Sequence, residues 1–105
     1  MQLSDLHIDA AGLAGICRRY HVERLEAFGS FASGQAEAGS DLDMLVTFEP
    51  GAAVGLEFVA LQQELSECLG RAVDLLTRAS VERSPNKYFR HYALRHTQVL
   101  YERAA

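Results

Sequence analysis

Residues 28–46, FGSFASGQAEAGSDLDMLV, combine a Gly-Ser turn with two aspartates that open an apolar run. The apolar side chains Leu42, Met44, Val46 and Phe48 alternate, which predicts a β-strand over residues 41–48. Asp41 and Asp43 then share the other face of this strand, with their Cα atoms about 7 Å apart. Because carboxylates at that separation repel each other, we expect a cation to lie between them.

A divalent metal ion is the cation that this pair fits best. Oxygen ligands with room for water suit Mg²⁺ or Mn²⁺. Asp74 lies alone in the apolar stretch RAVDLLT, residues 71–77, which predicts another strand. If the two strands are neighbours, Asp74 is the third oxygen ligand. The alternatives are a solvent-facing strand edge for the aspartate pair and a salt-bridged strand residue for Asp74.

Gly29 and Ser30 follow a predicted strand, residues 21–28, and precede a stretch that contains one helical turn at most. Glycine allows a ligand to approach the backbone closely, and the N–H groups and the Ser30 hydroxyl at a helix start can hold phosphate. An ordinary turn is the alternative. Ser40 either contacts nucleotide or caps its loop. Phosphate donors facing a carboxylate-held metal indicate a nucleoside triphosphate site.

The remaining pattern predicts a single domain over residues 1–105 with an α/β fold, in which helices pack on a small mixed sheet of about four strands. Asp9 is the expected N-cap of a helix at residues 9–20, and Gly70 ends a helix at residues 55–69. Ser84 and Pro85 are expected to start a third helix, with Phe89, Tyr92 and Ala93 buried. Residues 97–102 form the last predicted strand.

Composition narrows the function classes. Apolar residues make up 49% of the chain and the net charge is −4, which favours a folded protein and argues against general nucleic-acid binding. No apolar run approaches the roughly 18 residues of a membrane span, and no basic leader precedes one, so we expect a cytoplasmic protein. Cys17 and Cys68 are expected to be buried, reduced thiols, and no histidine joins them at a zinc spacing.

The charge is unevenly distributed. Residues 1–77 hold 4 Lys/Arg against 12 Asp/Glu, whereas residues 78–105 hold 6 against 2. A basic tail on an acidic body suggests a polyanion site or an acidic partner surface, with a solvated helix face as the alternative.

The motif GSFASGQAEAGSDLDMLV with the downstream VDLL resembles the signature of the DNA polymerase β-like nucleotidyltransferase superfamily, and it is most similar to the minimal nucleotidyltransferases (MNT). The resemblance covers nearly the whole chain. It implies that Asp41 and Asp43 bind metal, that Asp74 is the third carboxylate and the general base, and that Gly29 and Ser30 bind the triphosphate. Members of this group are antitoxins that transfer AMP from ATP to a tyrosine of a HEPN ribonuclease toxin, which implies a hetero-oligomer with that toxin.

One position departs from the family pattern. Many minimal members carry arginine where this chain has Ser33, and a basic residue there would help to hold phosphate. Arg78, just past the strand of Asp74, is a candidate to compensate. The departure leaves open an antitoxin that acts by binding alone. A further alternative is transfer to a small hydroxylated molecule such as an aminoglycoside.

Overall fold

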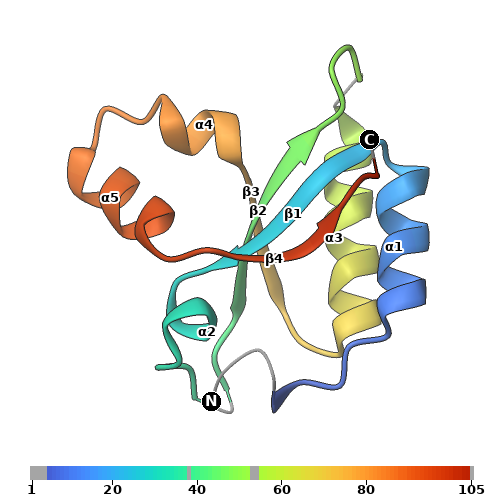
Figure 1. The fold of residues 1–105 in the computed structure, drawn as a ribbon, viewed down its shortest axis with the longest axis horizontal. Coiled ribbons are helices and arrows are strands. Elements are labelled where there is room, and N and C mark those ends of the chain that lie inside the picture. The colour runs from blue at the N-terminus through green and yellow to red at the C-terminus, as the bar shows by residue number, and fades with distance from the viewer. Residues whose placement is uncertain (1–4, 38, 53–54, 105) are drawn as a thin grey trace.

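The structure, a computed structural model, describes residues 5–37, 39–52 and 55–104. Helices and strands alternate along the chain, as expected, except that two helices follow one another before the last strand (Figure 1). The elements are α1 (Ala10–Arg19), β1 (Val22–Phe28), α2 (Ser30–Ser33), β2 (Leu42–Phe48), α3 (Leu56–Leu69), β3 (Val73–Thr77), α4 (Arg78–Glu82), α5 (Lys87–Arg95) and β4 (Gln98–Glu102).

The strands form a mixed four-stranded sheet in the order β3-β2-β1-β4. β1 pairs antiparallel with β2 and with β4, and β2 pairs parallel with β3. The register places Asp43 of β2 between Phe28 of β1 and Asp74 of β3. The mixed sheet of an α/β fold is therefore confirmed, and so is the expectation that the strand of Asp74 lies next to the aspartate pair.

Helices α1 and α3 lie side by side on one face of the sheet (Figure 1). The Asp9 side chain caps α1 by accepting a hydrogen bond from the Gly12 N–H at 3.1 Å, and Gly70 ends α3 in the left-handed region with φ 64°. Both caps were predicted. Among the described residues no helix is long and apolar enough to cross a bilayer.

The main core lies between these two helices and the sheet. Its fully buried members come from α1, the strands and α3, and include Leu13, Cys17, Leu25, Leu42, Met44, Val46, Leu61 and Leu65. Cys17 is a buried free thiol, as expected, and burial raises its pKa to about 12. Cys68 is free and only partly buried, packed against the same core.

The other face of the sheet is covered by the α4–α5 lobe, residues 78–95 (Figure 1). A smaller cluster lies under it, in which Phe28, Leu45, Val81 and Ala93 are buried. Leu45 belongs to the strand face that also carries Asp43. Both faces of β2 are thus packed at its centre, and Asp43 lies near one end of a buried strand.

Glu26 on β1 fixes both ends of this lobe to the sheet. Its side chain is only 2% exposed. Both carboxylate oxygens lie 2.9 Å from Nη1 of Arg78, the first residue of α4. The hydroxyl of Thr97, just before β4, donates to Glu26 Oε1 at 3.0 Å. A buried carboxylate needs such partners, because an unpaired charge there would cost several kcal/mol.

The lobe differs from the prediction in three respects. Helix α5 begins at Lys87 rather than after Ser84, because the Asn86 side chain accepts hydrogen bonds from the N–H groups of Tyr88 and Phe89. The short helix α4 was not predicted; Thr77 caps it. The expectation that Tyr92 is buried was wrong, since 54% of its surface is exposed.

Candidate functional site

The three predicted carboxylates lie at one end of the parallel strand pair. Asp43 is on β2 and Asp74 is its register partner on β3, while Asp41 directly precedes β2. Neighbouring strands are about 4.8 Å apart, so Asp43 and Asp74 are adjacent across the ladder. Asp41 and Asp74 are exposed and Asp43 is half-buried. The sheet therefore brings Asp74 beside Asp43, which lies 31 positions earlier in the sequence.

The negative charges of the three carboxylates act on one another. Burial raises the pKa of Asp43 above its usual range, and the negative charges of Asp74 and Asp41 raise it further. The site therefore disfavours its own negative charge, and a bound cation would relieve that cost. Carboxylate oxygens are the ligands that Mg²⁺ and Mn²⁺ prefer, so the donor set fits such an ion.

The carboxylates are neighbours without forming a closed ligand cage. Within the described part of the chain, no three His, Cys, Asp or Glu side chains converge closely enough to hold a metal ion as they stand. Mg²⁺ commonly keeps several waters and binds through one or two carboxylates plus substrate phosphates. An open arrangement of this kind is compatible with an ion that arrives together with a nucleotide.

Gly29, the residue after β1, packs against Asp43. Its φ of 71° is a conformation that residues with a side chain rarely adopt. A Cβ added at Gly29 would lie 2.6 Å from Oδ2 of Asp43 and 3.0 Å from the Tyr92 hydroxyl oxygen. The absence of a side chain therefore has two causes here, the backbone conformation and the close approach of Asp43 and Tyr92.

The predicted Ser30 start of a helical turn is confirmed, since α2 begins at that residue with Gly29 before it. Phe31 is fully buried and anchors the turn, and the Arg71 guanidinium lies 4.9 Å from its ring centroid. Ser33, which stands where many family members have arginine, is exposed at the end of α2.

Ser40 lies in the loop ahead of Asp41. Its hydroxyl accepts a hydrogen bond from the Glu37 N–H at 2.8 Å, and its carbonyl accepts one from Arg71 Nη1 at 3.0 Å. These contacts hold the loop in shape and correspond to the capping alternative. Among the residues that the structure describes, no bond uses the hydrogen of the Ser40 hydroxyl, so a nucleotide contact by Ser40 stays a prediction.

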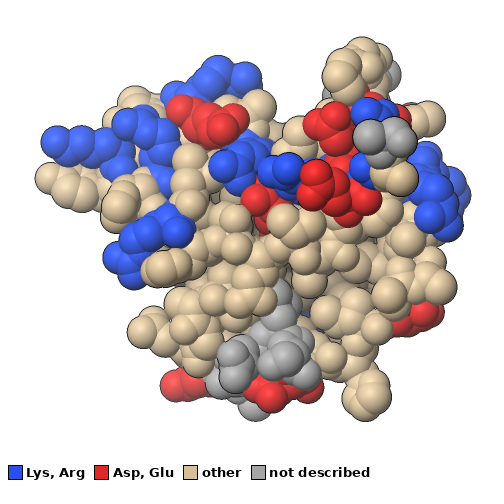
Figure 2. All heavy atoms as spheres, in the orientation of Figure 1, with Lys and Arg blue, Asp and Glu red and all other residues tan. Residues whose placement is uncertain are grey.

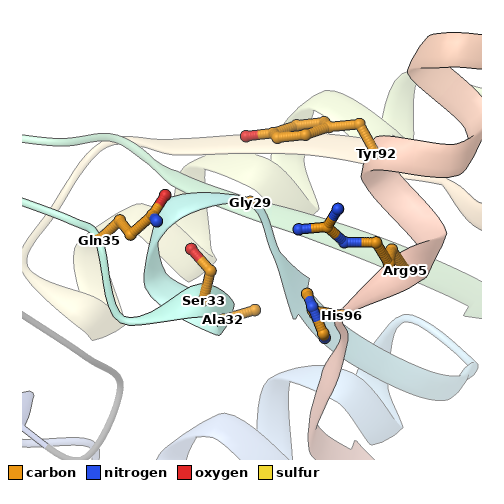
Figure 3. Close-up of a pocket in the computed structure, with 7 residues that line it drawn as sticks. All are labelled: Gly29, Ala32, Ser33, Gln35, Tyr92, Arg95 and His96. Carbon is orange, nitrogen blue, oxygen red and sulfur yellow. The ribbon is translucent and has the colours of Figure 1, made fainter.

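The sequence did not reveal a set of residues on α5 that face the Gly29 turn. A cavity of about 410 Å³ lies between α2 and the end of α5 (Figure 3). It is lined by Gly29, Ala32, Ser33, Gln35, Tyr92, Arg95 and His96. Tyr92 and Arg95 are three positions apart and so share a helix face. That spacing was visible in the sequence, but only the tertiary fold shows that this face meets Gly29.

Arg78 is not available to replace the missing arginine at position 33. It is held by the buried Glu26 and also lies 3.5 Å from Glu82. The suggestion that Arg78 compensates is therefore replaced by a structural role. Lys and Arg side chains do gather over the α4–α5 lobe, as Figure 2 shows, and Arg95 is the member of that group that lines the cavity.

Comparison with known proteins agrees with this geometry. Residues 12–100 match the family model of the nucleotidyltransferase domain. A Methanocaldococcus jannaschii protein assigned as a protein adenylyltransferase is 41% identical over 66 residues, which cover 63% of this chain and 70% of that protein. The protein adenylyltransferase MntA of Thermococcus cleftensis is 38% identical over 64 residues. That match covers 61% of this chain and 64% of MntA, just under two thirds of its length.

Solved structures with the same fold include a protein assigned as a minimal nucleotidyltransferase, 33% identical with a TM-score of 0.68. That alignment covers 93% of this chain and 95% of the other. A toxin–antitoxin complex with AMP-PNP aligns at a TM-score of 0.66, covering 91% of this chain and 75% of that one. At 19% identity it shows the fold alone. From the matched domain, the relatives and the site geometry, the chain belongs to the nucleotidyltransferase domain family.

Proposed function

We propose that this chain transfers AMP from ATP to a tyrosine hydroxyl of a partner protein, with Mg²⁺ or Mn²⁺ as the metal. The observation that carries the proposal is the register of Asp43 opposite Asp74, beside the close-packed turn at Gly29. Metal-binding carboxylates next to a backbone that phosphate can approach are what phosphoryl-type transfer requires.

Each side chain has a role in this proposal. Asp41 and Asp43 would hold the metal, which when bound would neutralise charge on the phosphates. Asp74 completes the carboxylate set and accepts the proton of the attacking hydroxyl. The hydroxyl oxygen forms a bond to the α-phosphorus of ATP, the bond from that phosphorus to the pyrophosphate oxygen breaks, and pyrophosphate leaves. The Gly29–Ser30 turn holds the phosphate chain, and Ser40 contributes a hydroxyl at the edge of the site.

A HEPN-domain toxin is the acceptor that we propose, in a hetero-oligomer with this chain. Two observations support it. MntA, which matches 61% of this chain, is named a protein adenylyltransferase, and the M. jannaschii relative, which matches 63%, is assigned as one. Proteins of the same fold occur in toxin–antitoxin complexes. One of these contains a tri-AMPylated HEPN toxin with its MNT antitoxin, at 18% identity and a TM-score of 0.57. In this assignment the acceptor tyrosine comes from the toxin.

The second candidate function is an antitoxin that neutralises its toxin by binding alone. Two observations favour it: Ser33 carries no charge at the cavity, and the described carboxylates form no closed metal cage. The two candidates differ in whether neutralisation depends on the aspartates. Transfer to a small hydroxylated molecule stays an alternative that the same assay can test by adding such acceptors in place of the partner.

The deciding experiment mixes the purified chain with the HEPN protein encoded beside it, labelled ATP and Mg²⁺, and measures the mass of the partner. We expect a gain of one or more AMP units on tyrosine. Asp41→Ala/Asp43→Ala should lower the rate by about 100-fold or more, because it removes the metal ligands. Glu57→Ala/Glu67→Ala removes two exposed carboxylates from α3 and serves as the matched control.

The control variant should transfer AMP at the wild-type rate. If the aspartate variant neutralises the toxin fully and wild type transfers no label, the chain acts by binding and the transferase proposal is wrong. If label appears on an aminoglycoside and not on the partner, the acceptor class is wrong while the chemistry stands.

A further inference from the structure

Arg95 has no carboxylate partner among the described residues, whereas four other arginines do. Arg19, Arg24, Arg78 and Arg103 each lie within ion-pair distance of a glutamate. Across residues 5–37, 39–52 and 55–104, no ion pair joins Arg95 to a carboxylate. Its positive charge is therefore not neutralised within the described structure.

The cavity in front of Arg95 has the character of an anion site. None of the described residues that line it is an aspartate or a glutamate, and the lining includes the guanidinium of Arg95, the imidazole of His96 and the amide of Gln35. Figure 3 shows the Arg95 side chain reaching from α5 toward Gly29, with Ser33 and Gln35 on the α2 side. Arginine presents a planar fork of donors that matches phosphate oxygens.

Gly29 connects this cavity to the aspartates. It lines the cavity, and Oδ2 of Asp43 would lie 2.6 Å from a Cβ at the same residue. A ligand that extends across Gly29 would thus meet the carboxylates at one end and Arg95 at the other. The carboxylates would repel an anionic ligand that carries no cation. The ligand must therefore bring a cation to the carboxylates and present its anionic groups to Arg95.

From these contacts we infer that Arg95 is a positioning residue for the terminal phosphates of the nucleotide. This inference rests on the proposed function for the identity of the nucleotide. The α-phosphate then lies beside the carboxylates, and the β- and γ-phosphates extend over Gly29 into the cavity. Arg95 lies on the opposite wall of the cavity from Ser33 and 62 positions later in the chain, and it supplies the positive charge that Ser33 lacks.

The test measures binding rather than turnover. A non-hydrolysable ATP analogue with Mg²⁺, inorganic tripolyphosphate and AMP are each titrated by calorimetry into wild type and variants. We expect Arg95→Ala to lower the affinity for the analogue and for tripolyphosphate by about 10- to 100-fold, the range of a charge-assisted hydrogen bond. The affinity for AMP should be unchanged. Arg95→Lys should retain part of the affinity, since it keeps the charge without the fork.

Two further variants make the result specific. Arg83→Ala removes the same charge from an exposed residue of the lobe that does not line the cavity, and it should bind all three probes like wild type. Ser33→Arg places a guanidinium on the facing wall, so it should restore tripolyphosphate binding to Arg95→Ala. Because Arg95 and Ser33 are both exposed, circular dichroism should show unchanged folding.

The inference fails if Arg95→Ala and Arg83→Ala bind the analogue equally well, or if AMP affinity falls as much as that of the triphosphate. It also fails if wild type binds no polyphosphate. If Arg95→Ala selectively loses polyphosphate binding but wild type transfers no AMP to any partner, the phosphate site at Arg95 stands and the proposed function is wrong. If wild type and Arg95→Ala transfer AMP at the same rate, the proposed function stands and the role of Arg95 is wrong.

Discussion

Asp43 and Asp74 are register partners on the parallel neighbours β2 and β3, and Gly29, the residue after β1, packs against Asp43. This relationship places two carboxylates side by side at a sheet position that apolar residues would otherwise stabilise. The cost is visible in the raised pKa of Asp43, to which burial and both neighbouring aspartates contribute. The clustered negative charges therefore lower the stability of the metal-free fold, and they would attract a cation to this site.

The first prediction concerns this cost in the metal-free protein. Because folding raises the pKa of Asp43, the folded state binds its proton more tightly than the unfolded state does. Stability from this group is present at pH values below the unfolded pKa and is lost as pH rises through the folded pKa. Asp43→Asn, which cannot ionise, should therefore unfold at a higher urea concentration than wild type at pH 7 in EDTA.

That advantage should shrink as pH falls through the folded pKa of Asp43, and it should be absent below about 4, where the wild-type carboxyl is protonated in both states. Asp5→Asn is the comparison for an exposed aspartate outside the site. An advantage of the same size at pH 3 and pH 7 would show that Asp43→Asn acts through packing rather than charge.

The second prediction concerns metal binding. Ligands that bind only the folded state stabilise it, by about 1.4 kcal/mol at ten times Kd. For a chain of this size that is a rise of several degrees in Tm. Mg²⁺ with a non-hydrolysable ATP analogue should raise the Tm of wild type and should leave that of Asp41→Ala/Asp43→Ala unchanged in differential scanning fluorimetry. Equal shifts for both proteins would place the ion elsewhere.

The third prediction concerns Gly29. Gly29→Ala should lower the free energy of unfolding by about 1–3 kcal/mol, because it combines a positive φ with a contact at 2.6 Å from Asp43 Oδ2. It should also abolish AMP transfer. Gly34→Ala is a matched control, since Gly34 has φ 80° and no heavy atom within 4 Å of the added Cβ. Gly34→Ala should show the backbone cost alone and keep transfer; loss of transfer in both variants would contradict the proposed role of Gly29.

The fourth prediction concerns Arg78 and tests whether it pairs with buried Glu26 or binds phosphate. Arg78→Ala leaves Glu26 buried without its main partner, which should cost about 3 kcal/mol in urea unfolding. Arg24→Ala breaks the exposed pair with Glu102 and should cost less than about 1 kcal/mol. At a temperature where Arg78→Ala is folded, its tripolyphosphate affinity should equal that of wild type. A large loss of that affinity would restore Arg78 as a phosphate ligand.

The sequence was sufficient where a local rule and the apolar pattern agreed. Asp9 as a cap, Gly70 as a helix end and alternation from Leu42 each specify one structure, and the structure has it. The start of α5 was missed because Ser84 and Asn86 are both good capping residues, and the hydrogen bonds of Asn86 decide between them.

Long-range contacts were the part that the sequence did not contain in readable form. The pairing of Glu26 with Arg78 joins residues 52 positions apart, and nothing in either segment indicates the other. Likewise Tyr92 looks like a core aromatic in a periodic helix, although its hydroxyl lies beside Gly29. The paired aspartates could be predicted because repulsion within one strand is a local signal, whereas the α5 wall depends on how the lobe folds back.

The contacts of Glu26 have a consequence for how this architecture can diversify. The chain leaves the sheet at Arg78 and returns to it at Thr97, and the side chains of both residues donate hydrogen bonds to the Glu26 carboxylate. An insertion, deletion or exchange between those two points would leave the strand order intact. Evolution can therefore remodel one wall of the cavity as an interchangeable module, while the aspartate-bearing strands stay constant beneath it.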